Sequence, residues 1–110
     1  RLIVDELRRE RRAPRHLVMG FVADKDLSHV LPLLEPLRGE LTLWFSAPSC
    51  QRGLEASALQ ARAADFGFTG RAVPDVNEAV RLARSEAGPH GFVLIAGSNF
   101  LAADLDLTRL

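Results

Sequence analysis

Apolar runs alternate along the chain with segments of helical spacing. Three runs are almost continuously apolar, at residues 16–22, 41–45 and 92–96. Such runs are typical of strands that are buried on both faces of a parallel sheet. The run from Phe92 to Ala96 is the clearest of the three, so we expect it to be the most plainly buried strand. A shorter and weaker strand is expected at residues 71–74.

The segments between these strands carry the patterns of helices, which are predicted at residues 1–12, 26–35, 55–66, 76–87 and 99–106. Pro32 opposes the second helix, because proline has no amide hydrogen and clashes with the preceding turn. Gly67 stands where a left-handed residue ends the third helix. Asp75, with Glu78 three residues later, has the spacing of an N-terminal capping box.

Strands that alternate with helices imply right-handed crossovers and a sheet covered on both faces. The predicted fold is therefore a three-layer α/β/α Rossmann-like domain with a mostly parallel sheet. A length of 110 residues, 47% of them hydrophobic, fits one domain and is too short for two.

Charge and cysteine content narrow the function classes. The chain has 14 basic and 14 acidic residues, and this balance argues against general nucleic-acid binding. The arginines near the N-terminus are interpreted as a solvated surface. One cysteine allows no internal disulfide, which suits a reducing compartment, and no apolar run approaches the roughly 18 residues that span a bilayer. We expect a cytoplasmic protein without a membrane segment.

Candidate site residues follow the strands, because ligands of parallel sheets bind at the carboxyl ends of the strands. Asp24, Lys25 and Asp26 come after the first strand, and they could bind a ribose, a cation or a phosphate, or only cap a helix. Arg52 follows the second strand and could hold a carboxylate or phosphate, or be a surface residue. Ser98 follows the last strand, where it could face an anion or serve only as an N-cap.

Several catalytic patterns are absent from the sequence. It contains no phosphate loop, no dinucleotide-binding glycine turn and no nucleophile elbow. The three histidines, His16, His29 and His90, lack metal-ligand spacing and are expected at strand edges or on the surface. We therefore expect no catalytic residue and no metal site in this chain, and no catalysis by the chain alone.

Three separate segments resemble one known domain when they are taken together. They are GFVADKD at residues 20–26, WFSA at 44–47 leading to Arg52, and GSNF at 97–100 running on to Asp104. In this order they are similar to the C-terminal domain of the folylpolyglutamate synthases, which often also have dihydrofolate synthase activity. These enzymes belong to the wider Mur ligase family.

The resemblance implies a function for the complete protein. The family joins L-glutamate to a folate carboxylate with the use of ATP and Mg²⁺. Most of the residues that bind the Mg²⁺ lie in a preceding central ATPase domain. Ser98 matches a serine near the glutamate pocket, and Arg52 matches a loop arginine that we assign to the same substrate. Asp24, Lys25 and Asp26 match the loop that faces the nucleotide and the interdomain cleft.

One departure from the family pattern concerns the start of the domain. The family's domain opens with a strand that ends in Asp-Gly-Ala-His-Asn, and this motif is absent here. Residues 1–110 are therefore expected to form a partial C-terminal domain without its first strand. The missing strand would leave an exposed position in the sheet, through which we expect the chain to self-associate. Two other readings stay open, a stand-alone α/β ligand-binding or regulatory module and a structural or interaction domain. Sequence upstream of Arg1 would separate the three.

Overall fold

The computed structural model describes residues 14–21, 27–29, 31–37, 39–47 and 53–97. Its strands are β1 (Arg15–Gly20), β2 (Leu41–Phe45), β3 (Gly70–Ala72) and β4 (Phe92–Gly97). Its helices are α2 (Ala56–Asp65) and α3 (Val76–Ala87), with the 3-10 segments η1 (Leu27–His29) and η2 (Leu31–Leu37). The helices predicted at 1–12 and 99–106 lie outside the described residues.

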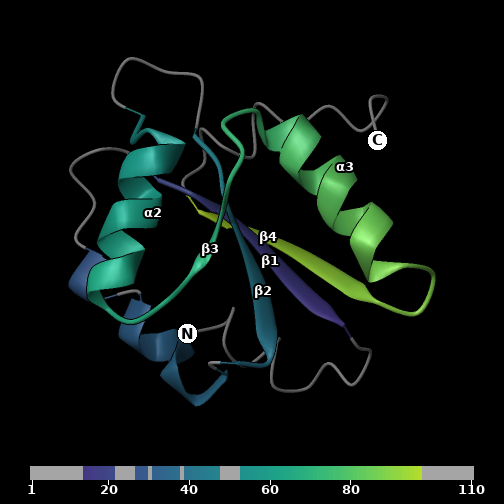
Figure 1. Ribbon diagram of the computed structural model, residues 1–110, viewed down its shortest axis with the longest axis horizontal. Helices are drawn as coiled ribbons and strands as arrows, with labels where there is room; N and C mark the ends of the chain where they lie inside the picture. Colours follow the sequence, from purple (N-terminus) through teal and green to yellow (C-terminus); the bar gives the residue numbers. More distant parts are fainter. Residues whose placement is uncertain (1–13, 22–26, 30, 38, 48–52, 98–110) are drawn as a thin grey trace.

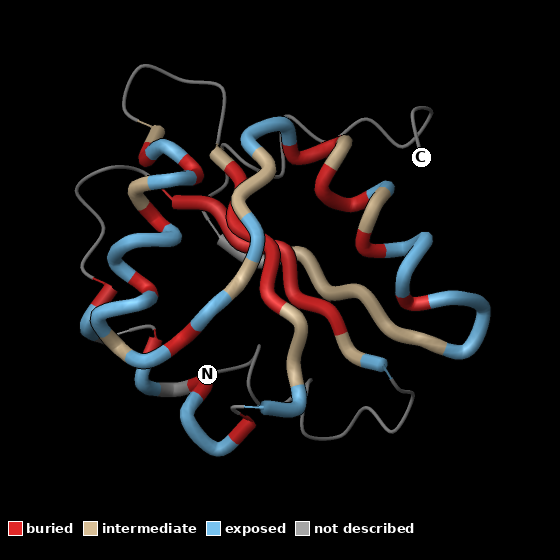
Figure 2. The backbone as a smooth tube through the Cα atoms, viewed as in Figure 1, coloured by how far each residue is buried: buried red, intermediate tan, exposed pale blue. Residues whose placement is uncertain are grey.

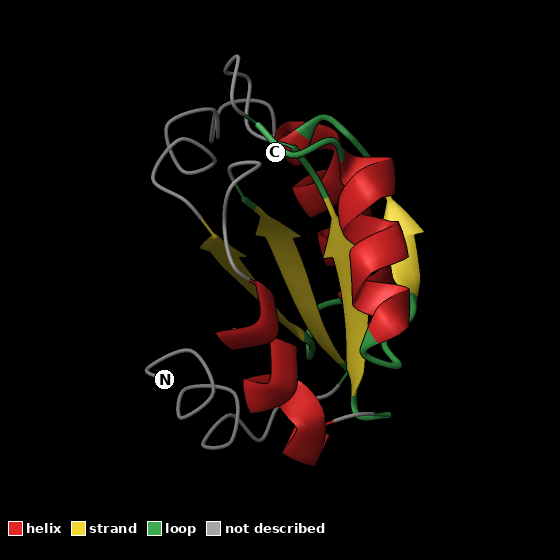
Figure 3. Cartoon of the chain, turned by 90° about the vertical axis from the view of Figure 1, so that its left-hand side faces the viewer, coloured by secondary structure: helices red, strands yellow, loops and turns green. Residues whose placement is uncertain are grey.

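The four strands form one parallel sheet in the order β3-β2-β1-β4. All four arrowheads point the same way in Figure 3. β1 is a central strand, and its last five residues are buried, as its apolar run predicts. The order places β1 between β2 and β4, so the predicted parallel sheet is confirmed.

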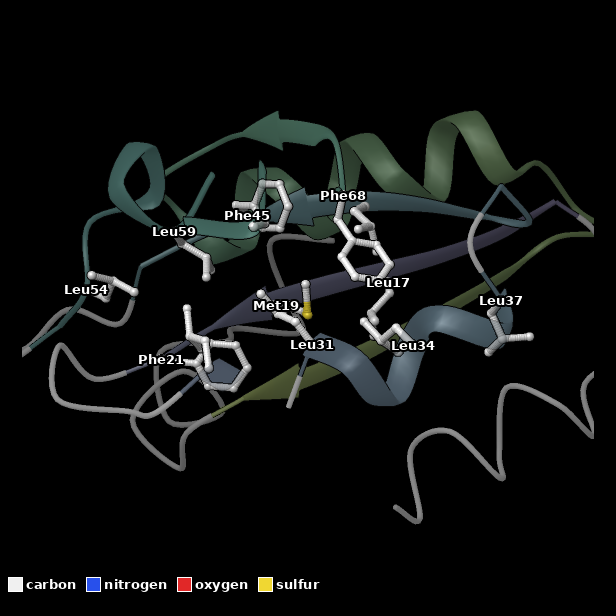
Figure 4. Close-up of a cluster of buried hydrophobic side chains, with 13 residues drawn as sticks. Leu17, Met19, Phe21, Leu31, Leu34, Leu37, Phe45, Leu54, Leu59 and Phe68 are labelled. Atoms are coloured by element: carbon white, nitrogen blue, oxygen red, sulfur yellow. The ribbon is translucent and has the colours of Figure 1, made fainter. Parts of the chain in front are cut away.

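Helices cover both faces of this sheet, which confirms the three-layer α/β fold (Figure 1). One face packs against η1, η2 and α2 through a large apolar cluster, which Figure 4 shows in close-up. This cluster comprises Leu17, Met19, Phe21, Leu27, Leu31, Leu34, Leu37, Leu43, Phe45, Leu54, Leu59, Ala63 and Phe68. The main core therefore lies on the face away from α3.

The opposite face packs against α3 through a smaller cluster. Its members are Val18, Trp44, Val76, Ala79, Val80 and Ala83. The four α3 residues form the predicted apolar stripe. Because two of them are alanines, α3 presents little side-chain volume to the sheet, while Trp44 supplies much of the volume from β2.

The segment predicted as a helix at 26–35 differs from the expectation in helix type. Two 3-10 segments stand there, and Leu27, Leu31 and Leu34 are buried as the stripe predicts. Proline explains the difference, because Pro32 and Pro36 lack amide hydrogens and their rings clash with the carbonyl four residues earlier in an α-helix. The buried face was therefore predicted correctly and the regular α-helix wrongly.

The expectation that β4 is the most plainly buried strand was wrong. Residues 92–95 are only half-buried, whereas most of β1 is fully buried (Figure 2). β4 is at the edge of the sheet, with β1 as its one strand partner among the described residues. An apolar run indicates that both faces of a strand are buried, but it does not indicate whether both edges pair with other strands.

The predicted helix ends are mostly confirmed. Asp75 accepts a hydrogen bond from the Asn77 amide at 3.0 Å, so its carboxylate caps α3. Gly67 has a φ of 85° directly after the end of α2, as expected for a left-handed C-terminal residue. Glu78, expected in a capping box, pairs with Arg81 one turn further along α3.

Candidate functional site

The carboxyl ends of β1, β2 and β4 meet at one edge of the sheet, here called the carboxyl rim. The strand register pairs Gly20 with Gly97 and Met19 with Phe45. The segments that follow these three strands in the sequence therefore all start from the same rim. This is the edge at which parallel sheets bind their ligands.

Backbone hydrogen bonds hold the described parts of the rim together. The Ser46 amide donates to the Met19 carbonyl at 2.7 Å, and the Leu54 amide donates to the Phe21 carbonyl at 2.8 Å. Phe21 directly precedes residues 22–26, and Leu54 comes shortly after residues 48–52. The described residues on either side of the two polar segments are thus hydrogen-bonded to each other.

Ser46 joins the end of β2 to the chain that leads into α3. Its side chain is fully buried, and its hydroxyl donates to the Val73 carbonyl at 2.6 Å. The Ala47 amide donates to the Pro74 carbonyl at 3.1 Å, and the Val73 amide donates to the Phe45 carbonyl at 2.8 Å. Ser46 was not among the site residues predicted from the sequence. Its place directly after a buried apolar strand is the signal that could have marked it.

The N-terminus of α3 also lies at the carboxyl rim, because α3 begins shortly after β3 ends. Helix N-termini attract anions through their unpaired amides. Here the carboxylate of Asp75 already accepts from the Asn77 amide. The start of α3 is therefore capped by the chain's own side chain.

The residues predicted to bind substrate all lie outside the described residues. They are Asp24, Lys25, Asp26, Arg52 and Ser98. The described strand ends next to them share one rim, and the convergence of these five side chains stays a prediction.

The described residues give no sign of a metal site or a membrane segment. No group of three or more His, Cys, Asp or Glu side chains among them could hold a metal ion. In the same part of the chain, no helix has the length and apolar character needed to cross a bilayer.

An open hollow of about 750 Å³ lies at the other end of α3. It is lined by the last turns of α3 and the start of β4, including Arg84, Pro89 and Phe92. This hollow is at the amino end of the sheet, and none of the predicted site residues line it. Its size alone does not outweigh the rule that parallel sheets bind ligands at their carboxyl ends.

Charged pairs with shifted pKa values lie on the α3 side of the sheet. Hydrogen bonds from the Arg71 guanidinium lower the pKa of the Glu86 carboxyl. A hydrogen bond to Glu78 raises the pKa of Arg81. These pairs are exposed, and each contributes little to stability because water screens exposed charges.

The fold and its rim define a class, a Rossmann-like α/β domain whose candidate binding edge is formed by the ends of parallel strands. No family model and no curated protein match the chain. A solved structure shares its fold with a TM-score of 0.61, the bifunctional folylpolyglutamate synthase/dihydrofolate synthase from Yersinia pestis, crystallised with AMPPNP and a Mn ion. The two sequences are 23% identical over 82% of this chain, and at this identity the likeness establishes the fold. The match covers only 20% of the length of that enzyme.

We predict that Ser46→Ala destabilises the domain by about 1–3 kcal/mol, because it leaves the Val73 carbonyl without its hydroxyl donor. Urea denaturation measures the change. Ser85→Ala, at an exposed position on α3, is the control and should stay within about 0.5 kcal/mol of the original chain. Equal stability of the two variants would contradict the role given to Ser46.

Proposed function

We propose that this chain is the C-terminal-type domain of an ATP-dependent ligase that adds glutamate to folate, a folylpolyglutamate synthase with or without dihydrofolate synthase activity. The observation that carries the proposal is the common rim. The three sequence segments that resemble the folate ligases each begin in the last residues of a strand that ends there. In a parallel sheet this edge is the one at which ligands bind, so the three segments stand where a substrate site is expected.

The likeness of the fold gives independent support. A folylpolyglutamate synthase/dihydrofolate synthase has a portion with this architecture, and that portion is a fifth of the enzyme. A domain that makes up a fifth of a ligase would work with other domains that hold the remaining chemistry. We therefore propose a partner domain in the same protein that carries the ATPase machinery.

The proposed roles of the site residues follow the resemblance. Ser98 and Arg52 bind the incoming glutamate, for which a hydroxyl and a planar guanidinium suit the α-carboxylate. Asp24, Lys25 and Asp26 face the cleft toward the nucleotide. Folate and L-glutamate are the proposed substrates of the complete enzyme.

ATP and Mg²⁺ belong, in this proposal, to the complete enzyme. The described residues offer no cluster of metal ligands, and the Asp75 carboxylate already caps α3. The proposal places the enzyme in the cytoplasm, because a chain with one cysteine suits a reducing compartment.

We predict that the purified 110-residue chain neither hydrolyses ATP nor ligates glutamate to folate. The sequence has no phosphate loop, so it lacks the means to hold the triphosphate. Phosphate release and product chromatography measure the two activities, with the full-length protein as the positive control. ATP-dependent product from the chain alone would overturn the assignment of catalysis to another domain.

In the full-length protein we predict that Ser98→Ala raises the KM for glutamate by up to about tenfold, the size of one lost hydrogen bond. The KM for ATP should change little. Steady-state kinetics with each substrate varied in turn measure the two constants. Ser57→Ala, at an exposed position on α2, is the matched control. An unchanged glutamate KM in Ser98→Ala would remove this residue from the glutamate site.

The outer edge of β4 supports a proposal about partners. Its half-buried apolar residues border an edge that has no strand partner among the described residues. The Phe92 amide donates to the Pro14 carbonyl at 3.0 Å, so it points toward the β1 side. Because strand amides alternate in direction, the Val93 amide points away from β1 and can donate to another strand.

We predict that the isolated chain self-associates through this edge at high concentration, because unpaired edges recruit further strands. Sedimentation velocity over a concentration series measures the association. Val93→Pro removes an outward amide while leaving the Phe92 amide in place, and it should shift the series toward the monomer. A monomer at every concentration, or association that Val93→Pro leaves unchanged, would refute this proposal.

A further inference from the structure

His16 is buried under α3, although its sequence context predicted an edge or surface position. Its side chain is almost inaccessible, with 2% relative exposure for the residue. The Trp44 indole nitrogen donates a hydrogen bond to His16 Nδ1 at 3.0 Å. The two residues belong to neighbouring strands, so this hydrogen bond, here called the His16–Trp44 link, ties β1 to β2.

The chemistry of the two rings fixes the protonation state of the link. An indole N–H can only donate, so Nδ1 of His16 must carry no proton. The neutral imidazole then carries its proton on Nε2. Protonation at Nδ1 would place two donors head to head at 3.0 Å in a site closed to water. The link therefore exists only while His16 is neutral.

Two charged residues face this pair from the neighbouring elements. The Arg71 guanidinium from β3 lies 3.9 Å from the centre of the Trp44 ring. Glu86 from α3 is held by two hydrogen bonds from Arg71. The remaining neighbours in the register, Thr42 on β2 and Val93 on β4, carry no charge.

These neighbours affect the protonation of His16 in opposite directions. Burial is the largest influence and lowers the pKa of His16. The negative charge of Glu86 raises this pKa, and the positive charge of Arg71 lowers it. Glu86 is already paired with Arg71, so its attraction for a protonated His16 is opposed by the neighbouring guanidinium.

We propose that the His16–Trp44 link is an acid-sensitive device that holds α3 on the sheet when His16 is neutral and loosens α3 when His16 is protonated. Trp44 is part of the apolar cluster that α3 covers, and Arg71 connects Trp44 to α3 through Glu86. α3 begins at the carboxyl rim beside the Ser46–Val73 hydrogen bond. Loosening α3 would therefore reach the candidate site.

The expected pH dependence follows from the direction of the shift. In the unfolded chain His16 titrates near its ordinary pKa of 6.5, and in the folded chain it titrates lower. Stability is therefore fully present above pH 6.5 and falls as the pH drops toward the folded pKa. Within that window one proton changes the folding equilibrium constant by about tenfold per pH unit.

Trp44 is the chain's single tryptophan, which gives a direct measurement. We expect its indole N–H resonance and its fluorescence to change between pH 7.5 and 4.5 with a midpoint below 6.5. Urea unfolding at the same pH values should show the stability loss. Long-range nitrogen–proton spectra at pH 7.5 should show His16 protonated on Nε2 alone.

Two substitutions separate His16 from the other titrating groups. His16→Asn keeps an acceptor near the Nδ1 position but does not titrate, so both the Trp44 transition and the stability loss in this window should disappear. His90→Asn removes an exposed histidine and should keep both effects. If His16→Asn does not fold, two measurements on the unmodified chain still test the proposal. They are the tautomer of His16 and the pH dependence of the Trp44 indole N–H resonance.

Three results would overturn the proposal. The first is a proton on Nδ1 of His16 at pH 7.5. The second is an indole resonance that stays unchanged down to pH 4.5 in a folded chain. The third is an acid transition of the same size in His16→Asn.

Discussion

The parallel pairing of β1 with a strand on each side is the constraint on which the rest of the structure depends. The backbone of β1 pairs with a strand at each edge, and its side chains are buried on both faces of the sheet. This burial explains the nearly unbroken apolar run in its sequence. The same pairing aligns Gly20 with Gly97 and Met19 with Phe45. A slip of one residue would turn every side chain of β1 to the wrong face and would also misalign the carboxyl rim.

The two faces of the sheet are packed by different kinds of side chain. The face under α2 and the 3-10 segments is packed by the larger cluster of apolar side chains. The face under α3 pairs small alanines with the large Trp44, whose polar nitrogen requires an acceptor in the interior. His16 meets that requirement, at the cost of placing a titratable group where its charged form is poorly tolerated. The α3 face is therefore the one whose packing depends on pH.

Much of the fold could be predicted from the sequence, because strand burial and helical stripes depend on local spacing. The 3-10 form of the segment at 26–35 depended on Pro32 and Pro36. The edge position of β4 depended on strand pairing, which the apolar run of one strand does not reveal. The role of His16 depended on Trp44, which lies 28 residues away in the chain. The carboxyl rim was predictable from the element order, whereas the convergence of the candidate site residues there stays a prediction. The buried hydroxyl of Ser46 was not predictable, because its acceptor is on a different strand connection.

The described part of the carboxyl rim and the α3 face are physically continuous. Ser46 fixes the end of β2 to the carbonyl of Val73, and Asp75 caps α3 shortly after that residue. The end of β2 and the start of α3 are therefore joined by a short, hydrogen-bonded stretch of backbone. α3 packs on the sheet mainly through small apolar contacts and the contacts around Trp44. The α3 face therefore combines small apolar side chains with the buried Trp44 and its hydrogen bond to His16, whereas the opposite face carries the larger apolar cluster.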